Sequence, residues 1–122
     1  MSISKHWLTS ALLAIFCLVL LDQTAKYLAL HNPGFTVYLW QPWLGWELFQ
    51  NPGVAFGLPL PNWLLVVSTP ILLIFLGLHS YKKVQHPKTS VAEMFGYTLI
   101  IGGALSNYID RVIYTVTIDY IR

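Results

Sequence analysis

Long stretches without a charged side chain limit this sequence to folds that place apolar helices in a membrane. No charged residue occurs from Trp7 to Leu21, and the apolar pattern continues past Asp22 and Lys26 to Leu30. A helix needs about 20 apolar residues to cross a bilayer core, so this stretch is long enough. Only 10% of the whole chain is charged and 56% is hydrophobic, whereas about 25% of a soluble protein is charged. We therefore expect an integral membrane protein.

Two more apolar stretches follow. The second contains Pro70, which a transmembrane helix tolerates, and the third has Glu93 near its start. Reading the first stretch as a cleaved signal peptide is disfavoured, because no small-x-small cleavage site follows Leu21. The sequence predicts one membrane domain over residues 1–122, with spans at about residues 7–30, 63–79 and 91–110.

The positions of the cations predict the orientation. Lys5 precedes the first span, and Lys82, Lys83 and Lys88 lie between the second and third spans. Residues 31–61, by contrast, carry only Glu47 as a charged residue. By the positive-inside rule, the N-terminus and residues 79–90 are cytoplasmic. Residues 31–61 and 110–122 then lie at the outer face. Because three spans leave the C-terminus outside, we expect a fourth span beyond Arg122.

The outer segment is rich in proline and tryptophan, and tryptophan is typical of membrane interfaces. Residues 35–40 and 44–51 are rich in aromatic and β-branched side chains and are separated by Gln41-Pro42-Trp43. This pattern predicts a β-hairpin lying on the membrane, within an outer β segment at about residues 35–60.

Several functional classes are excluded by residue counts. A net charge of +2 gives no basic surface that would bind a nucleic-acid backbone. Cys17 is the only cysteine, so no internal disulfide is available, and no Cys/His pattern indicates a metal site. Polar residues inside apolar stretches are more informative, because ionisable groups at membrane depth are costly and usually functional.

Asp22 and Lys26 stand four residues apart, so they share a helix face, and we interpret them as a structural ion pair. Further along, Gly102-Gly103 favours close helix packing. Asn107, Asp110 and Arg111 follow on one face. They form either a binding face or an interfacial cap in which Asp110 pairs with Arg111.

Asp119 lies in the β-type run Val116–Ile121, among apolar neighbours. Burial would raise its pKa, while a solvated position at the interface would leave the pKa ordinary. The residue type alone does not separate these two environments. The run Asn51 to Gly57 contains Asn-Pro and Pro-Gly, which are ordinary turn dipeptides, and is not specific by itself.

Taken in order, four motifs resemble the bacterial lipoprotein signal peptidases, or signal peptidase II. They are D-x-x-x-K at Asp22–Lys26, N-x-G-x-A-F at Asn51–Phe56, G-G-x-x-x-N-x-x-D-R at Gly102–Arg111, and T-I-D-Y at Thr117–Tyr120. The resemblance implies an all-α integral membrane protein with a four-helix transmembrane fold, of which three helices are present, and a small extracytoplasmic β-sheet.

The resemblance also implies an aspartic endopeptidase of the bacterial cytoplasmic membrane. Its substrates would be diacylglyceryl-modified prolipoproteins, cut N-terminal to the lipidated cysteine, and membrane lipid would surround it. No metal or organic cofactor is implied, because water is the nucleophile. Asp119 matches one of the family's two catalytic aspartates. The other belongs to an F-N-x-A-D motif that is not among these residues, so we expect the given chain to be an inactive fragment.

The remaining motif positions carry supporting roles by resemblance. Residues matching the substrate site are Asn51, Asn107 and Arg111, and those matching positions that mainly hold its shape are Asp22, Lys26, Gly53, Ala55, Gly103 and Asp110. Ser106 and Thr115 depart from the family, which commonly has glycine at both places, and Thr117 stands where valine is frequent.

Two other functions remain open at this point. A non-catalytic relative that binds signal peptides or lipidated peptides becomes the better interpretation if the natural chain ends at Arg122. A small transporter subunit would use Asp22 and Lys26 in an ion path, but it predicts broken helices at mid-membrane. The polar groups of this chain lie instead near one membrane face.

Overall fold

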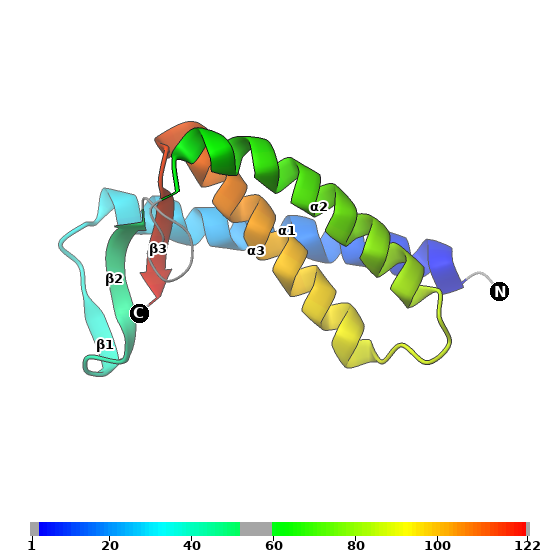
Figure 1. The fold of residues 1–122 in the computed structure, drawn as a ribbon. Coiled ribbons are helices and arrows are strands. Elements are labelled where there is room, and N and C mark those ends of the chain that lie inside the picture. Colours follow the sequence, from blue (N-terminus) through cyan, green and yellow to red (C-terminus); the bar gives the residue numbers. More distant parts are fainter. Residues whose placement is uncertain (1–2, 52–59, 122) are drawn as a thin grey trace.

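The computed structural model describes residues 3–51 and 60–121, which form three helices and one three-stranded sheet (Figure 1). The helices are α1 (Ile3–His31), α2 (Asn62–Val84) and α3 (Val91–Tyr114), and the strands are β1 (Val37–Trp40), β2 (Leu44–Asn51) and β3 (Thr117–Ile121). Helix α3 packs against both α1 and α2. The sheet lies at one end of the helices, and the turn between α2 and α3 lies at the other.

Exposed apolar side chains cover the helices, while much of what is buried is polar. Phe16 and Phe75 are 65% and 67% exposed, whereas Lys26 and Asp110 are 3% and 0% exposed. This distribution suits a protein whose surroundings are lipid, where unpaired polar groups are costly and apolar surface is not. Two helices among the described residues, His6–His31 of α1 and Asn62–Val84 of α2, are long and apolar enough to cross a membrane.

The third predicted span forms a helix, α3, but α3 is not one of the two helices that are long and apolar enough to cross a membrane. Polar and charged residues interrupt its apolar pattern. Four of its five buried residues, Thr98, Gly102, Ser106 and Asp110, lie on one stripe at intervals of four, and the fifth is Arg111. A stripe of small and polar residues permits close helix packing in lipid. The crossing of the membrane by α3, and a fourth helix, therefore stay predictions.

The ends of α3 have specific caps. Ser90 Oγ accepts a hydrogen bond from the backbone N–H of Glu93 at 3.1 Å, the arrangement of an N-terminal cap. At the other end, Thr115 adopts a left-handed conformation with φ of 64°, and its N–H donates to the carbonyl of Arg111 at 3.2 Å. This cap turns the chain out of α3 and into β3 after only two residues.

The predicted hairpin is confirmed, although its first strand begins at Val37. Strands β1 and β2 pair antiparallel, and β3 pairs antiparallel with the other edge of β2. In the second pairing Phe49 lies opposite Asp119, and Asn51 lies opposite Thr117. Gly53, Ala55 and the rest of residues 52–59 lie outside the described residues.

Candidate functional site

Close packing of α1 on α3 brings their polar residues together. A Cβ atom added at Gly102 would lie 3.4 Å from the Cβ atom of Leu18, so a larger side chain would push the helices apart. Gly103 differs, because no described atom lies within 4 Å of the equivalent position. The predicted close approach is thus confirmed at Gly102 and stays a prediction for Gly103.

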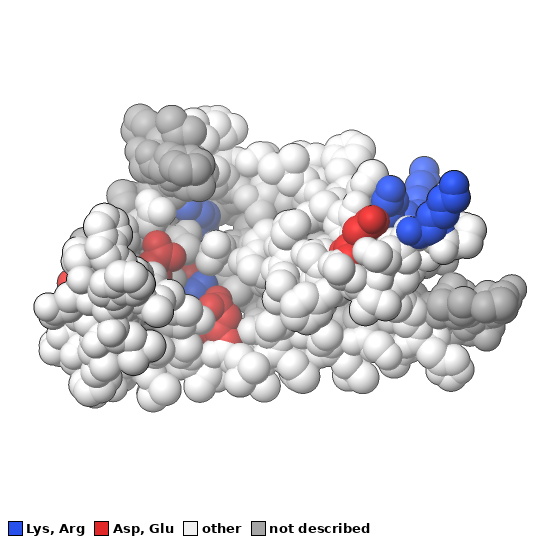
Figure 2. Space-filling view, turned by 90° about the horizontal axis from the view of Figure 1, so that it is seen from below, with Lys and Arg blue, Asp and Glu red and all other residues white. Residues whose placement is uncertain are grey.

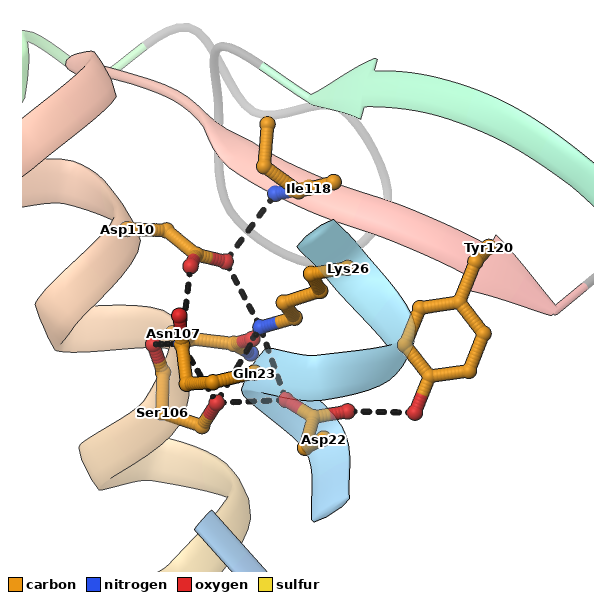
Figure 3. A network of polar contacts seen from close by, with 8 residues as sticks. All are labelled: Asp22, Gln23, Lys26, Ser106, Asn107, Asp110, Ile118 and Tyr120. Atoms are coloured by element: carbon orange, nitrogen blue, oxygen red, sulfur yellow. Dashed lines mark hydrogen bonds and ion pairs between the residues drawn. The ribbon is translucent and has the colours of Figure 1, made fainter. Parts of the chain in front are cut away.

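Lys26 is the centre of the polar network (Figure 3). Its Nζ atom lies 2.8 Å from Asp22 Oδ2 and 2.6 Å from Asp110 Oδ2. The same ammonium donates to Asn107 Oδ1 at 3.0 Å and to Ser106 Oγ at 3.3 Å. The predicted Asp22–Lys26 pair is confirmed, and it extends across to α3.

Asp110 pairs with Lys26 across the helix interface, whereas the sequence had suggested the adjacent Arg111 as one partner. The physical reason is that consecutive residues on a helix do not face each other. Fully buried, Asp110 also accepts hydrogen bonds from Gln23 Nε2 at 3.0 Å and from the backbone N–H of Ile118 at 3.1 Å. One carboxylate thereby joins α1, α3 and β3.

Gln23 was missed by sequence reasoning, although it stands three residues before Lys26 and so shares its helix face. Its amide also donates to Ser106 Oγ at 2.8 Å. Ser106 is fully buried, and its hydroxyl donates to Asp22 Oδ2 at 2.5 Å while accepting from Lys26 and Gln23. A residue that departs from the family pattern is therefore a full member of the network.

Tyr120 was also missed. Its hydroxyl donates to Asp22 Oδ1 at 2.5 Å, and its ring lies 5.1 Å from the ring of Trp46. Burial raises the pKa of Tyr120, and the hydrogen bond to Asp22 raises it further, so this phenol is a donor at neutral pH. This contact joins β3 to α1 one residue after Asp119, whereas the Ile118 hydrogen bond joins β3 to α3 one residue before it.

Asp119 lies between these two anchored neighbours, at the edge of a hollow of about 180 Å³. Lys26 and Asn107 line the same hollow. Burial raises the pKa of Asp119; the charge of Lys26 opposes that rise, and the charges of Asp110 and Asp22 add to it. Of the two environments left open by the sequence, the structure favours partial burial.

A second hollow, of about 450 Å³, lies along α1 and α3. It shares Asp22 and Tyr120 with the first hollow, and its other lining residues are Leu18, Leu21, Ala25, Leu99, Gly102 and Gly103. A mostly apolar surface therefore leads to the polar surroundings of Asp119. Within residues 3–51 and 60–121, no group of three or more His, Cys, Asp or Glu side chains is arranged to hold a metal ion.

Two further predicted site residues, Asn51 and Arg111, lie near Asp119. Asn51 is half-buried at the end of β2 and pairs with Thr117, two residues from Asp119. Arg111 is buried, and its charge lowers the pKa of Asp119, although less than Lys26 does. The backbone carbonyl of Arg111 accepts a hydrogen bond from Asn62 Nδ2 at 3.2 Å, which ties the end of α3 to the start of α2.

Comparison with known proteins gives consistent results. The family described as "Signal peptidase (SPase) II" matches residues 14–122. The lipoprotein signal peptidase of Bartonella henselae is 41% identical over 113 residues, covering 90% of this chain and 68% of that protein. That of Thermodesulfovibrio yellowstonii is 36% identical over 113 residues, covering 89% and 71%.

A solved structure titled as a bacterial membrane enzyme, at 2.3 Å resolution, has a similar fold. Its TM-score is 0.76 at 24% sequence identity, and the match covers 93% of this chain and 70% of that one. The chain thus spans about two thirds of the length of such relatives. With four ordered motifs, matched relatives and a shared fold, the chain belongs to the signal peptidase II family.

Proposed function

We propose that this chain carries one half of the catalytic site of a membrane aspartic endopeptidase. The enzyme removes the signal peptide from diacylglyceryl-modified prolipoproteins by cutting N-terminal to the lipidated cysteine. Membership of the signal peptidase II family supports the reaction class. The placement of Asp119 supports its role as one of the two acids.

The anchoring of β3 on both sides of Asp119 is the observation that carries this proposal. The backbone N–H of Ile118 is held by Asp110, and the hydroxyl of Tyr120 is held by Asp22. Both carboxylates are bound to Lys26, so one buried cation fixes both anchors. Reacting groups must be held to within a fraction of an ångström, and anchored neighbours provide that restraint.

The chemistry needs a second carboxylate close to Asp119. Two acids that share one proton divide the work, because one activates water while the other polarises the scissile carbonyl. Neither Asp22 nor Asp110 is free for this role, since each is paired with Lys26 and accepts other hydrogen bonds. We assign the second acid to the F-N-x-A-D motif of the family, which these 122 residues do not contain.

The two adjoining hollows support the substrate class. The larger, mostly apolar one would hold apolar side chains of the signal peptide, and the smaller one would place the scissile bond at Asp119. Asn51, Asn107 and Arg111 would contact or support the peptide. Asp22, Lys26 and Asp110, with Gly53, Ala55 and Gly103, would maintain the shape of the site.

We place the protein in the bacterial cytoplasmic membrane, with its N-terminus in the cytoplasm and the sheet at the outer face. The lysines of the α2–α3 turn lie at the end of the molecule opposite the sheet, which agrees with the positive-inside rule. A site at the outer face would meet prolipoproteins after their lipidation.

The test uses the product of the whole coding sequence that includes these residues, assayed for release of the signal peptide from a diacylglyceryl-modified prolipoprotein. Asp119→Asn is expected to abolish processing and to leave membrane insertion unchanged. Glu93→Gln, which alters a carboxylate in the first turn of α3, is the matched control and should process normally. Processing by Asp119→Asn at the parental rate would contradict the assignment. Processing by residues 1–122 alone would contradict the need for a second acid.

A further inference from the structure

Basic side chains gather at the end of the molecule that is opposite the sheet (Figure 2). Lys82 and Lys83 belong to the last turn of α2, and Lys88 lies in the turn before α3. These lysines line a hollow of about 390 Å³ together with His79, His86 and Thr89. No Asp or Glu is among the described residues that line it. The lining of the hollow is therefore basic, with one acidic side chain beside it (Figure 2).

The three lysines are available to a ligand. All are exposed, and none forms an ion pair with another described residue. The carbonyl of Lys83, at the C-terminal end of α2, accepts hydrogen bonds from the backbone N–H of His86 at 3.0 Å and from the hydroxyl of Thr89. None of the three ammonium groups forms an ion pair with a described carboxylate, although one acidic side chain lies beside them (Figure 2), so an anion is still the complementary ligand.

The imidazoles at the edge of the hollow are held in place. His79 Nε2 lies 3.2 Å from the hydroxyl of Tyr97 on α3, and the two rings pack edge to face. His86 Nδ1 accepts a hydrogen bond from the backbone N–H of Lys88 at 3.2 Å. These contacts fix the shape of the turn, so the hollow is a defined feature of the fold.

The surface that leads to the hollow is apolar. On α2, Leu72, Phe75 and Leu78 are all more than half exposed, and this helix is apolar enough to cross a membrane. Lipid acyl chains lie against such a surface, and the phosphate of the same lipid lies at the level where the helix ends. Apolar chains and an anionic head on one molecule match both features, whereas a free phosphate matches only the second.

We propose that this hollow binds the headgroup of one anionic phospholipid, with Lys82, Lys83 and Lys88 contacting its phosphate and its acyl chains lying along α2. Basic pockets next to transmembrane helices on the cytoplasmic side are suited to such headgroups. The site is separate from the surroundings of Asp119, which lie at the opposite end of the helices. It therefore does not depend on the proposed proteolytic function.

The test measures lipid binding to the full chain purified in a non-ionic detergent. Phosphatidylglycerol, phosphatidylcholine and inorganic phosphate are titrated separately, with the unfolding midpoint and the number of lipids retained in native mass spectrometry as the two readouts. Phosphatidylglycerol is expected to raise the midpoint saturably, with one lipid retained per chain. The zwitterionic lipid and inorganic phosphate should produce no such shift.

Two variants separate a built site from general attraction. The triple change Lys82→Gln, Lys83→Gln and Lys88→Gln should weaken phosphatidylglycerol binding by roughly tenfold or more. The matched triple change to arginine keeps the charge and should retain binding within about threefold. Both variants should unfold at the parental midpoint without lipid, because the lysines are exposed. Parental binding by the glutamine variant, or equal effects of phosphatidylcholine or inorganic phosphate, would overturn the proposal.

Discussion

Lys26 on α1 and Asp110 on α3 form a buried ion pair at 2.6 Å, although 84 positions separate them along the chain. Asp22 shares the same ammonium at 2.8 Å, so two carboxylates depend on one cation. Loss of the charge of Lys26 and loss of the charge of Asp110 should therefore have unequal effects on stability. Removing Lys26 leaves two carboxylates without a counter-ion, whereas removing the charge of Asp110 leaves Lys26 paired with Asp22.

The first prediction follows from that inequality. Lys26→Met should lower the free energy of unfolding by about 3–5 kcal/mol, because it leaves buried charge uncompensated. Asp110→Asn should lower it by only about 1–3 kcal/mol, because the amide oxygen still accepts hydrogen bonds. Reversible unfolding in lipid-free detergent measures both, with the exposed Lys88→Met as a control expected within about 0.5 kcal/mol of the parent. A larger loss for Asp110→Asn than for Lys26→Met would contradict this account of the network.

The second prediction concerns the phenol beside Asp119. Tyr120→Phe removes only the hydroxyl that donates to Asp22 and keeps the ring against Trp46. Stability should fall by about 0.5–1.5 kcal/mol. In the whole enzyme, kcat should fall by roughly tenfold with little change in KM, because small displacements of a reacting group are costly.

Tyr81→Phe, at the exposed far end of α2, is the matched control for Tyr120→Phe and should change neither quantity. If the free energy of unfolding drops for Tyr120→Phe while kcat stays at the parental value, Tyr120 is structural and does not position Asp119.

The third prediction is a pH dependence. Burial raises the pKa of Asp119 above its ordinary value of 3.8, so the folded protein binds this proton more tightly than the unfolded chain does. Stability then falls as pH rises from the unfolded pKa through the raised folded pKa, and the full penalty is present above both. Asp119→Asn removes the charge, so it should flatten this part of the stability profile and make the inactive protein more stable at neutral pH. Unfolding measured between about pH 3 and pH 8 tests this, and a less stable Asn variant at neutral pH would refute it.

Features that depend on local spacing could be predicted from the sequence. The apolar runs of α1 and α2 follow from lipid being their solvent, and the two flanking strands follow from aromatic and β-branched residues around Gln41-Pro42-Trp43. The Asp22–Lys26 pair follows from helix periodicity, because both residues are on one helix. In each case the interacting residues lie within a few positions of one another.

Contacts between distant segments could not be predicted in the same way. Gln23, Ser106 and Tyr120 join the network only because α1, α3 and β3 meet at one end of the helices. Sequence spacing suggested Arg111 as one partner of Asp110, and it gave no sign that Lys26 lay across the interface. Residue type indicated that these groups were unusual, but only the packing of α3 on α1 determines which of them touch.

The fourth prediction concerns the left-handed residue at the end of α3. Thr115 has φ of 64°, a conformation that costs a β-branched residue about 1–2 kcal/mol and costs glycine little. Thr115→Gly should therefore raise the free energy of unfolding by about 0.5–1 kcal/mol after the greater chain entropy of glycine is counted. Thr117→Gly, in the buried extended strand β3, is the contrasting control and should be destabilising. No gain from Thr115→Gly would show that the hydrogen bond from Thr115 Oγ1 to the Tyr114 carbonyl, at 2.6 Å, offsets the strain.

The fifth prediction concerns the close contact between β1 and β2. A Cβ atom added at Gly45 would lie 2.4 Å from Tyr38 Cδ1 and 2.6 Å from the carbonyl oxygen of Val37. The tyrosine ring could rotate away, but its hydroxyl is bound to Glu47, and the carbonyl belongs to the backbone of β1. Gly45→Ala should therefore displace β1 and lower stability by about 1–3 kcal/mol.

Hydrogen exchange locates the effect of Gly45→Ala. Amides of β1 and of its partner residues on β2 should lose protection, while the ladder between β2 and β3, which carries Asp119, should keep it. Gly34→Ala is the matched control, because nothing lies within 4 Å of the added methyl group, and it should leave the exchange pattern unchanged. Equal protection in the two variants would show that the close contact at Gly45 does not constrain the hairpin. Loss of protection throughout β3 would show instead that the three strands form one cooperative unit, so that the hairpin helps to hold Asp119 in place.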